Sequence, residues 1–149
     1  MFTEKIGNVW DLADSNSAIC ILTNNSVLDG KNPMGGGIAY EALQRNEHLD
    51  EVVAKAIKYN VMFLARDIET NAVLLRFPTK HSIYDASSSL DLIKSSLHSL
   101  HLFAKSNPAT TIYLPQPGCG IGGLDWIKDV RPLCVEILGD VSNVCIVSK

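Results

Sequence analysis

Hydrophobic positions along the chain follow two patterns that alternate with each other. Short, continuous apolar runs with β-branched members are typical of strands buried on both faces. Apolar residues three or four positions apart mark the buried face of a helix. The apolar runs predict strands at residues 2–9, 18–23, 61–66, 72–78, 110–114 and 144–147. The helical spacing predicts helices at residues 38–45, 48–59, 90–107 and 129–138.

The order of these elements predicts an α/β fold, a three-layer α/β/α sandwich around a central sheet. Only a short turn, Glu69-Thr70-Asn71, separates the two middle strands, so they should form an antiparallel hairpin. The sheet is therefore expected to be mixed rather than wholly parallel. The chain shows no internal repeat, linker or low-complexity segment. Its 149 residues suit one domain, residues 1–149, with a sizeable core.

Composition narrows the classes of function. The formal net charge is −3, which argues against an extended nucleic-acid footprint, because such a surface needs clustered Lys and Arg. The four cysteines form no C-x-x-C pair, so we expect reduced thiols rather than a disulfide framework or a metal site. Neither a signal-peptide pattern nor an apolar run of about 18 residues occurs, which predicts a cytoplasmic protein without a membrane segment.

The candidate chemistry is concentrated in two glycine-rich segments, each followed by a predicted helix. One covers residues 30–37, and the other, residues 114–126, holds four glycines between Gly118 and Gly123. Glycine lets the backbone turn sharply and approach a ligand closely. A loop between a strand and a helix directs its N–H groups at an anion, most often a phosphate. Two such loops predict a diphosphate held from two sides.

The second segment also satisfies G-x-G-x-x-G, the dinucleotide-binding fingerprint of Rossmann folds, at Gly118, Gly120 and Gly123. That fingerprint opens a βαβ unit, with an acidic residue about 20 positions further on. Here only one predicted strand follows, and it ends in Val147-Ser148-Lys149 without an acid. A Rossmann site is therefore disfavoured.

Four segments, taken in order, resemble the macrodomain family over nearly the whole chain. They are Thr23-Asn24-Asn25, then Met34-Gly35-Gly36-Gly37-Ile38-Ala39, then Phe77-Pro78-Thr79-Lys80, and finally residues 117–126. Within the family, the chain looks most like the branch of the DarG-type antitoxins and the terminal ADP-ribose glutamate hydrolase. The DarG-type antitoxins remove ADP-ribose from DNA bases.

The resemblance implies an ADP-ribose pocket across the carboxyl ends of the central strands. The glycine segments would hold the diphosphate and the distal ribose, with no metal and no cofactor. The residues that the resemblance places against the ligand are Asn8, Val9, Asn24, Asn25, Met34, Gly35, Gly36, Gly37, Ile38, Pro117, Gly118, Cys119, Gly120, Ile121, Gly122 and Gly123.

Some of these positions carry a particular expectation. Asn24 matches the family asparagine that orients the distal ribose, with Asn25 as a second candidate. Asn8 stands where many macrodomains have an aspartate that accepts from the adenine amino group; an asparagine oxygen also accepts, but without charge assistance. Asn8 and Asn24 are also compatible with ordinary turns or strand ends bonded to the backbone. Ile121 would cover the ligand with its apolar side chain.

Lys80 is the candidate catalytic residue, because it matches the lysine of Phe-Pro-Thr-Lys in the DarG-like branch. A partly desolvated lysine has a lowered pKa and can act near the anomeric carbon as a nucleophile or as a proton donor or acceptor. A solvated surface lysine is the alternative interpretation. Cys119 lies in the phosphate loop, where amides could lower its pKa, or it is simply a small residue packed beneath that loop.

At two glycines the chain differs from the sequence patterns of the proteins that it resembles. The DarG-type pattern usually has a lysine where this chain has Gly36, which removes one positive contact to phosphate. The glutamate hydrolase has a catalytic aspartate where this chain has Gly122, so its Lys–Asp mechanism does not carry over intact. Asp125 lies three residues later and is expected to cap the following helix.

The sequence thus favours a hydrolase that removes ADP-ribose from a modified nucleic acid or protein, with Lys80 at its centre. An ADP-ribose-1″-phosphate phosphatase is one alternative. A non-catalytic module that reads or sequesters ADP-ribose, or a related NAD-derived nucleotide, is the other. The expected partner in each case is ADP-ribose or a molecule that carries it.

Overall fold

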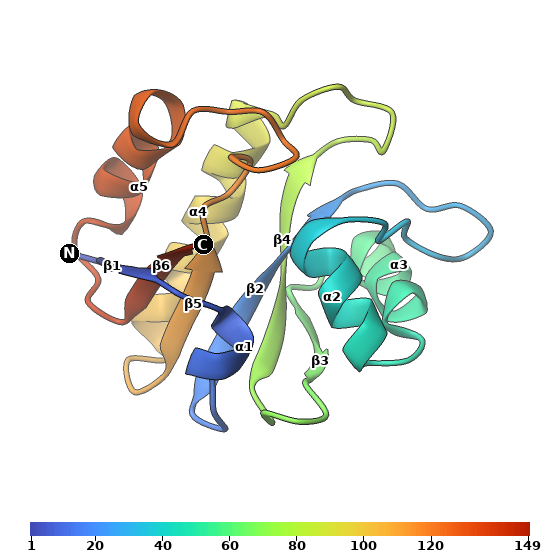
Figure 1. Cartoon of the computed structure of the whole chain (residues 1–149), viewed down its shortest axis with the longest axis horizontal. Coiled ribbons are helices and arrows are strands. Elements are labelled where there is room, and N and C mark those ends of the chain that lie inside the picture. Colours follow the sequence, from blue (N-terminus) through green and yellow to red (C-terminus); the bar gives the residue numbers. More distant parts are fainter.

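Helices and strands alternate along most of the chain, as the hydrophobic pattern predicts (Figure 1). The computed structural model describes residues 1–149. Its elements are β1 (Thr3–Ile6), α1 (Val9–Leu12), β2 (Ser17–Asn24), α2 (Gly37–Arg45), α3 (Leu49–Tyr59), β3 (Phe63–Arg66), β4 (Val73–Lys80), α4 (Leu90–Ser106), β5 (Thr111–Pro115), the π-helical turn η1 (Trp126–Val130), α5 (Arg131–Leu138) and β6 (Val144–Ser148).

The six strands form one mixed sheet in the order β1-β6-β5-β2-β4-β3. Every neighbouring pair is parallel except β3 and β4, which form the antiparallel hairpin predicted from Glu69-Thr70-Asn71. The expected α/β sandwich with a mixed sheet is confirmed. Because β2, β4, β5 and β6 run parallel, their carboxyl ends lie along one edge of the sheet.

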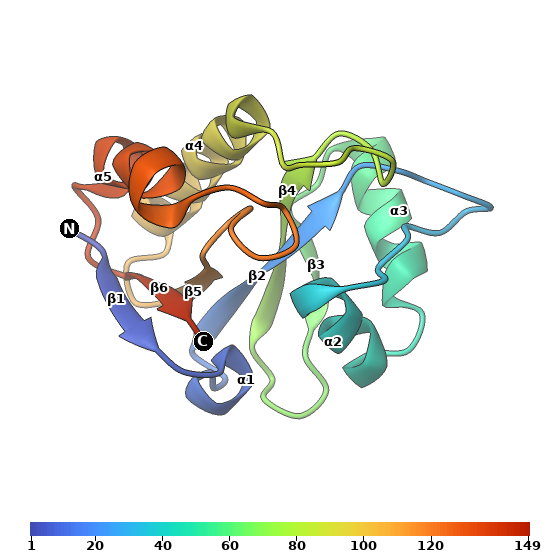
Figure 2. The ribbon, with the colours of Figure 1, turned by 45° about the horizontal axis from the view of Figure 1, so that its top comes forward.

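Alternate side chains of the buried strand β2 pack into two separate hydrophobic cores. Ala18 and Cys20 belong to the core that also contains side chains of α4 and α5. Ile19 and Ile21 belong to the core that contains side chains of α2 and α3. This is the period of two expected for a strand covered on both faces. Figure 2 shows the result, with α4 and α5 on one side of the sheet and α2 and α3 on the other.

The largest differences from the sequence prediction are at three places in the chain. The first strand ends at Ile6 rather than at residue 9, because the Asn8 side chain accepts a hydrogen bond from the N–H of Trp10 and begins α1. Strand β4 continues through Lys80, where a loop was expected, and pairs there with β2. The last predicted helix, 129–138, is divided into η1 and α5, with Asp125 capping η1 as expected and Pro132 in the first turn of α5.

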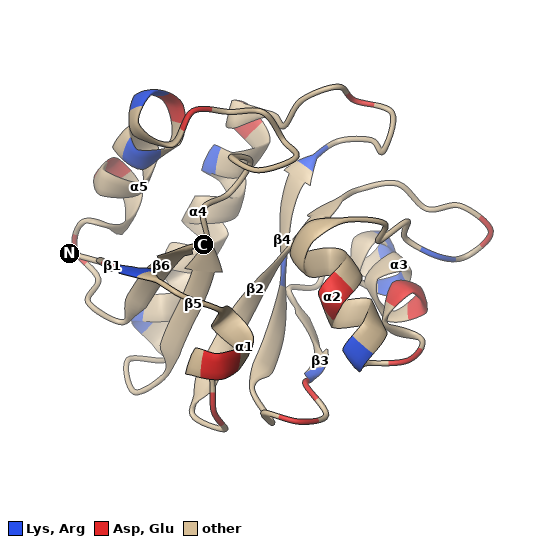
Figure 3. Cartoon of the chain, in the orientation of Figure 1, with Lys and Arg blue, Asp and Glu red and all other residues tan.

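Charged residues of both signs are interspersed over the chain, as Figure 3 shows. The ribbon carries no continuous stripe of Lys and Arg, which is in keeping with the formal net charge of −3. No helix in the structure combines the length and the apolar character needed to span a membrane.

A buried carboxylate joins α2 to the β3–β4 hairpin. Asp67 is fully buried. It accepts hydrogen bonds from Arg45 Nε at 3.0 Å, from Arg45 Nη2 at 2.9 Å and from Asn46 Nδ2 at 2.9 Å. Thr70 donates to it from both its backbone N–H and its hydroxyl group. Burial alone would raise the pKa of Asp67, but these hydrogen bonds outweigh it and hold the pKa well below its usual range.

We expect Asp67→Asn to lower the free energy of unfolding at pH 7 by about 3 kcal/mol, because it removes the buried carboxylate that pairs with Arg45 and accepts from Asn46 and Thr70. Since the folded pKa of Asp67 is depressed, its contribution is present above the unfolded value of about 3.9 and is lost as the pH falls toward the folded value. Urea unfolding at pH 7 and at acid pH checks both points. The difference in the free energy of unfolding between parent and variant should become smaller below about pH 4.

Glu69→Gln is the matched control. Glu69 contacts the same Arg45 at 3.3 Å, but its side chain is 71% exposed, so its loss should change the free energy of unfolding by less than about 1 kcal/mol. Equal effects of the two substitutions would contradict the assignment of Asp67 as the principal partner.

Candidate functional site

A cavity of about 670 Å³ lies across the carboxyl ends of four parallel strands. Its lining includes the last residues of β2, β4, β5 and β6, the start of α2, and the glycine segment that follows β5. The predicted residues that line it are Asn8, Val9, Asn24, Gly35, Gly36, Gly37, Ile38, Lys80, Gly118, Cys119, Gly120, Ile121 and Gly122. The volume is within the range typical of small-molecule sites.

The position of the cavity follows from the path of the chain. Strands β2 and β5 are neighbours in the sheet, but the chain leaves β2 toward α2 on one face and leaves β5 toward α5 on the other. Where two adjacent parallel strands continue to opposite faces, a crevice opens outside their carboxyl ends, and α/β proteins bind ligands there. The two glycine segments form the two walls of this crevice.

The first wall ends in a helix whose N-terminus has no side-chain cap. Gly36 occupies the N-cap position of α2 and cannot accept the hydrogen bonds that Ser89 and Asp125 accept at the starts of α4 and η1. The N–H groups of Gly37, Ile38 and Ala39 have no acceptor within the chain. Because Gly36 to Ala39 line the cavity, these free donors and the positive end of the helix dipole lie at its wall.

The second wall also presents backbone donors. The N–H groups of Gly120, Ile121 and Gly122 have no acceptor within the chain. The segment is folded back on itself, because Leu124 N–H donates to the carbonyl of Gly118 at 2.8 Å. Successive unpaired N–H groups in a tight turn form an anion-binding concavity. The two walls therefore offer hydrogen-bond donors from opposite sides, although neither 33–37 nor 116–124 contains a charged side chain.

The second wall is packed too tightly for a side chain at Gly122. A Cβ there would lie 2.2 Å from Ser88 Oγ and 2.6 Å from the carbonyl oxygen of Gly118. Ser88 also donates its N–H to the carbonyl of Gly122 at 3.0 Å, which holds the segment against the start of α4. Gly118 has φ +75°, and a Cβ there would meet Ile93 and Leu124 at 2.9 Å. The conformation of the wall therefore depends on glycine at both positions.

The two walls meet through one apolar side chain. Ile121 is 74% exposed, and its Cδ1 lies 2.8 Å from the point where a Cβ of Gly36 would stand. Ile121 lines the cavity together with Gly36. Its side chain therefore spans the gap between the two glycine segments.

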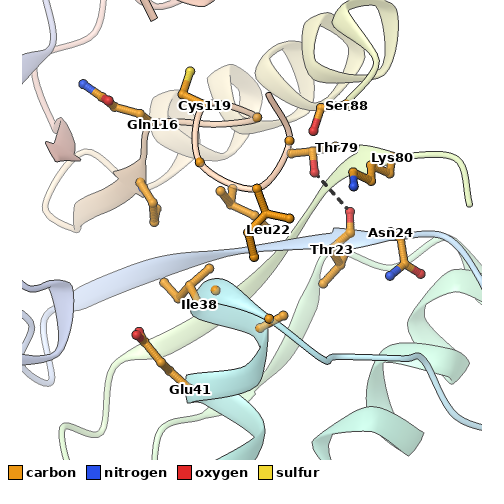
Figure 4. Close-up of a pocket in the computed structure, with 18 of the residues that line it drawn as sticks. Leu22, Thr23, Asn24, Ile38, Glu41, Thr79, Lys80, Ser88, Gln116 and Cys119 are labelled. Carbon is orange, nitrogen blue, oxygen red and sulfur yellow. Dashed lines mark hydrogen bonds between the residues drawn. The ribbon is translucent and has the colours of Figure 1, made fainter. Parts of the chain in front are cut away.

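Lys80 lies at one end of the cavity with Thr23, Asn24 and Thr79 (Figure 4). A bulge between β2 and β4 leaves Thr79 without a register partner, since Thr23 is opposite Pro78 and Asn24 is opposite Lys80. In a regular strand consecutive side chains point to opposite faces, but a bulge changes this direction, and here both Thr79 and Lys80 reach the cavity. The Thr79 hydroxyl donates to the carbonyl of Thr23 at 3.5 Å.

The charge of Lys80 is not neutralised by the protein. Its side chain is half-buried, and it forms no ion pair. The single carboxylate among the lining residues, Glu41, lies at the other end of the cavity (Figure 4). Glu41 accepts from Trp10 Nε1 at 2.9 Å and pairs with Lys149 at 3.3 Å. The cavity thus has the unpaired Lys80 at one end and Lys149, paired with Glu41, at the other.

Comparison with known proteins identifies the fold. No protein-family model matches the sequence, and no curated protein sequence does. Solved structures do match. The macrodomain of Thermus aquaticus DarG superposes with a TM-score of 0.79 at 21% identity, covering 100% of this chain and 99% of that one. The macrodomain of Mycobacterium tuberculosis DarG gives 0.75 at 25% identity, covering 100% and 98%. The chain has the macrodomain fold of these DarG structures.

A third structure of this fold is longer than the present chain. Thermosipho africanus DarTG, solved in complex with ADP-ribose, superposes with a TM-score of 0.68 at 22% identity. The match covers 89% of this chain, which spans 38% of the length of that protein.

Four residues that the resemblance placed against the ligand lie outside the lining of this cavity. Met34 is buried in the core beneath α2 and α3. Pro117 and Gly123 shape the second wall without lining the cavity, and Gly123 donates its N–H to the carbonyl of Gly120. The side chain of Asn25 points away from that of Asn24. It accepts a hydrogen bond from Arg76 and lines a second cavity.

Two predicted asparagines form internal hydrogen bonds. Asn24 donates from Nδ2 to the carbonyl of Pro33 at 3.0 Å, and its Oδ1 accepts from the N–H of Ser26 and from Asn32. It therefore fixes the segment before α2 to the end of β2, and one Nδ2 hydrogen remains for a ligand. The Oδ1 of Asn8 accepts the capping hydrogen bond from the N–H of Trp10 at the start of α1. Its Nδ2 donor has no partner in the chain.

The suggestion that Cys119 has a lowered pKa is wrong. Burial, with smaller contributions from the carboxylates of Asp125 and Asp129, raises the pKa of the Cys119 thiol to about 11. The thiol donates to the carbonyl of Pro117 at 3.3 Å and packs against the core under α4 and α5. Cys119 is therefore a packing residue beneath the loop rather than a reactive thiolate.

Sequence reasoning missed several lining residues. Thr79 stands in the motif that contains Lys80, and Ser88 precedes the predicted helix 90–107, but the sequence indicated no role in the site for either. Glu41 lies on the helix that follows the first wall, at the exposed face of a regular amphipathic pattern. Only the three-dimensional packing brings Ser88 and Glu41 to the cavity, and no local sequence pattern distinguishes them.

We expect Gly122→Ala to lower the free energy of unfolding by about 1–3 kcal/mol, because its Cβ would overlap Ser88 Oγ and a backbone oxygen. Thermal unfolding of the purified variant checks this. Gly120→Ala is the matched control, since nothing lies within 4 Å of a Cβ at that position, and it should stay within about 0.5 kcal/mol of the parent. A Gly122→Ala variant as stable as Gly120→Ala would contradict the packing described here.

Proposed function

We propose that this macrodomain binds ADP-ribose and removes it from a modified nucleic acid or protein. One observation carries the proposal. A single cavity joins two sets of free backbone N–H groups to an unpaired lysine, with the α2 N-terminus on one side and Gly120–Gly122 on the other. The complex of Thermosipho africanus DarTG with ADP-ribose, a protein of the same fold, supports the choice of ligand.

The diphosphate of ADP-ribose suits the middle of the cavity. Its oxygens are negatively charged acceptors, and the two walls supply donors and a helix dipole instead of charged side chains. Hydrogen bonds to a charged group are stronger than those between neutral groups. The adenosine would extend toward Asn8 and Glu41, and the distal ribose toward Asn24 and Lys80.

Hydrolysis needs the bond between the anomeric carbon of the distal ribose and the modified group to break, with water supplying the new oxygen. Lys80 is the one charged side chain at that end of the cavity. Its amine would act near the anomeric carbon as a nucleophile or as a proton donor or acceptor. Thr79 and the bulge in β4 would position it by turning the strand end toward the cavity.

A non-catalytic reader of ADP-ribose is the second candidate, and a specific observation favours it. The end of the cavity that holds Lys80 contains no carboxylate, and Gly122 has no space for one. A general base that activates water is usually a carboxylate or a histidine. If Lys80 cannot supply this function alone, the same contacts bind ADP-ribose without turnover.

Calorimetry with ADP-ribose and with adenosine tests the binding site. We expect one ADP-ribose per chain and an affinity for adenosine that is at least about tenfold lower, because adenosine lacks the diphosphate that the two walls would hold. Equal affinities would contradict the assignment of the walls to the diphosphate. The absence of binding at millimolar ADP-ribose would contradict both candidate functions.

Turnover measurements with Lys80→Ala and Lys80→Arg test the chemistry. The substrates are an ADP-ribosylated DNA oligonucleotide, a peptide ADP-ribosylated on an acidic side chain, and ADP-ribose 1″-phosphate. We expect Lys80→Ala to reduce kcat by about 100-fold or more, with a much smaller change in ADP-ribose affinity. Lys80→Arg keeps the charge but loses the nucleophilic and proton-transfer capacity, so it should be similarly inactive.

Lys31→Ala is the control, because Lys31 is exposed in the first glycine-rich segment and does not line the cavity. It should retain parental activity. Full activity of Lys80→Ala would remove Lys80 from the mechanism. Tight ADP-ribose binding without turnover of any of the three substrates would favour the reader.

A further inference from the structure

A second cavity, of about 230 Å³, lies at the edge of the sheet where β3 begins and β4 continues past it. Its lining comes from four regions: the segment after β2, the segment after α3, the edge of β4, and one side of α4. Most of the lining side chains are polar, in contrast to the hydrophobic cores on either side of the sheet. The polar members are Asn25, Asn60, Arg76, Ser95, Ser96 and Ser99.

Arg76 is a buried cation without an anionic partner. It is 9% exposed, yet it takes part in none of the ion pairs of the chain. Arg45 and Arg131, by contrast, pair with Asp67 and Glu4 at 2.9 and 3.0 Å. Burial lowers the pKa of Arg76 from its usual value, because no carboxylate compensates for the lost water. Isolated buried charges are costly, and proteins normally pair them.

The neighbours of Arg76 are neutral and accept only part of its hydrogen bonds. Its Nε donates to the carbonyl of Val61 at 3.2 Å, and its two terminal nitrogens donate to Asn25 Oδ1 at 3.1 Å and to Asn60 Oδ1 at 3.4 Å. A guanidinium group has five N–H donors, so two are left. These three contacts fix the position of the Arg76 guanidinium group in the cavity.

The rest of the lining contains further groups that can donate hydrogen bonds. Because Asn25 and Asn60 turn their oxygens toward Arg76, their Nδ2 groups remain unengaged. The hydroxyl groups of Ser95 and Ser99 have no partner in the chain, whereas Ser96 donates to the carbonyl of Pro78 at 2.7 Å. The cavity thus combines one unneutralised positive charge with free hydrogen-bond donors on several sides.

We propose that this second cavity is a binding site for a phosphate group. A tetrahedral oxyanion supplies the negative charge that Arg76 lacks and acceptors for donors that converge from β4, α4 and the end of α3. Arg76 would bind it with its remaining N–H groups, and Ser95 and Ser99 with their hydroxyls. The site is separate from the cavity that holds Lys80 and does not depend on the function proposed for it.

A residue-resolved NMR titration with inorganic phosphate, at constant ionic strength in chloride, tests the site. We expect saturable shifts in the backbone signals of Asn60, Ser95 and Ser99 and in the side-chain amides of Asn25 and Asn60. The glycine segments around the first cavity are followed in the same spectra, so phosphate bound there is counted separately. A parallel titration with dimethyl phosphate shows whether the site takes a diester, as in a nucleic-acid backbone, or a free phosphate.

Arg76→Met should weaken phosphate binding at these signals on the order of tenfold or more. Arg66→Met is the matched control, because Arg66 is an exposed arginine on the adjacent strand β3, and it should bind phosphate as the parent does. Ser95→Ala combined with Ser99→Ala changes only exposed positions of α4 and should reduce the affinity severalfold with the fold intact. No saturable shift in the parent, or undiminished binding in both cavity variants, would overturn the proposal.

Discussion

Backbone N–H groups without acceptors are the feature on which the principal cavity depends. A buried or half-buried N–H group normally finds a partner, because leaving it unpaired costs free energy. In this chain the first turn of α2 and the segment Gly120–Gly122 leave such groups on opposite sides of one crevice. The sheet creates the crevice, since β2 and β5 are adjacent but continue to opposite faces. An anionic ligand would satisfy donors that the protein itself does not.

The same tight packing that shapes the second wall limits the chemistry available to it. Ser88 holds the segment against α4 through the carbonyl of Gly122, and its hydroxyl fills the space that a Cβ would need. An acid at this position would require the wall to take another conformation. The titratable side chain nearest this wall's far end comes instead from a strand end, where an irregularity in the pairing of β2 with β4 turns Thr79 and Lys80 toward the cavity.

Much of this architecture could be predicted from the sequence, because its causes are local. The alternation of apolar runs with helical spacing predicts the layers, and the glycine segments predict the two walls. The first strand was predicted too long because Asn8 stops it with a side-chain bond that competes with the sheet. The position of Asn25 could not be predicted, since its side chain is drawn to Arg76, 51 residues further along the chain. The contributions of Ser88 and Glu41 likewise arise from tertiary packing alone.

The contact between Ile121 and Gly36 bears on the kinetics of exchange at the principal cavity. The walls themselves are braced by hydrogen bonds to α4 and to the end of β2, so opening them would require slow, concerted movement. The two walls contact each other only through the side chain of Ile121, which is largely exposed. Exposed side chains change rotamer within nanoseconds. A small molecule could then enter and leave without a loop transition, and its residence time would be determined by the hydrogen bonds it makes rather than by a gate.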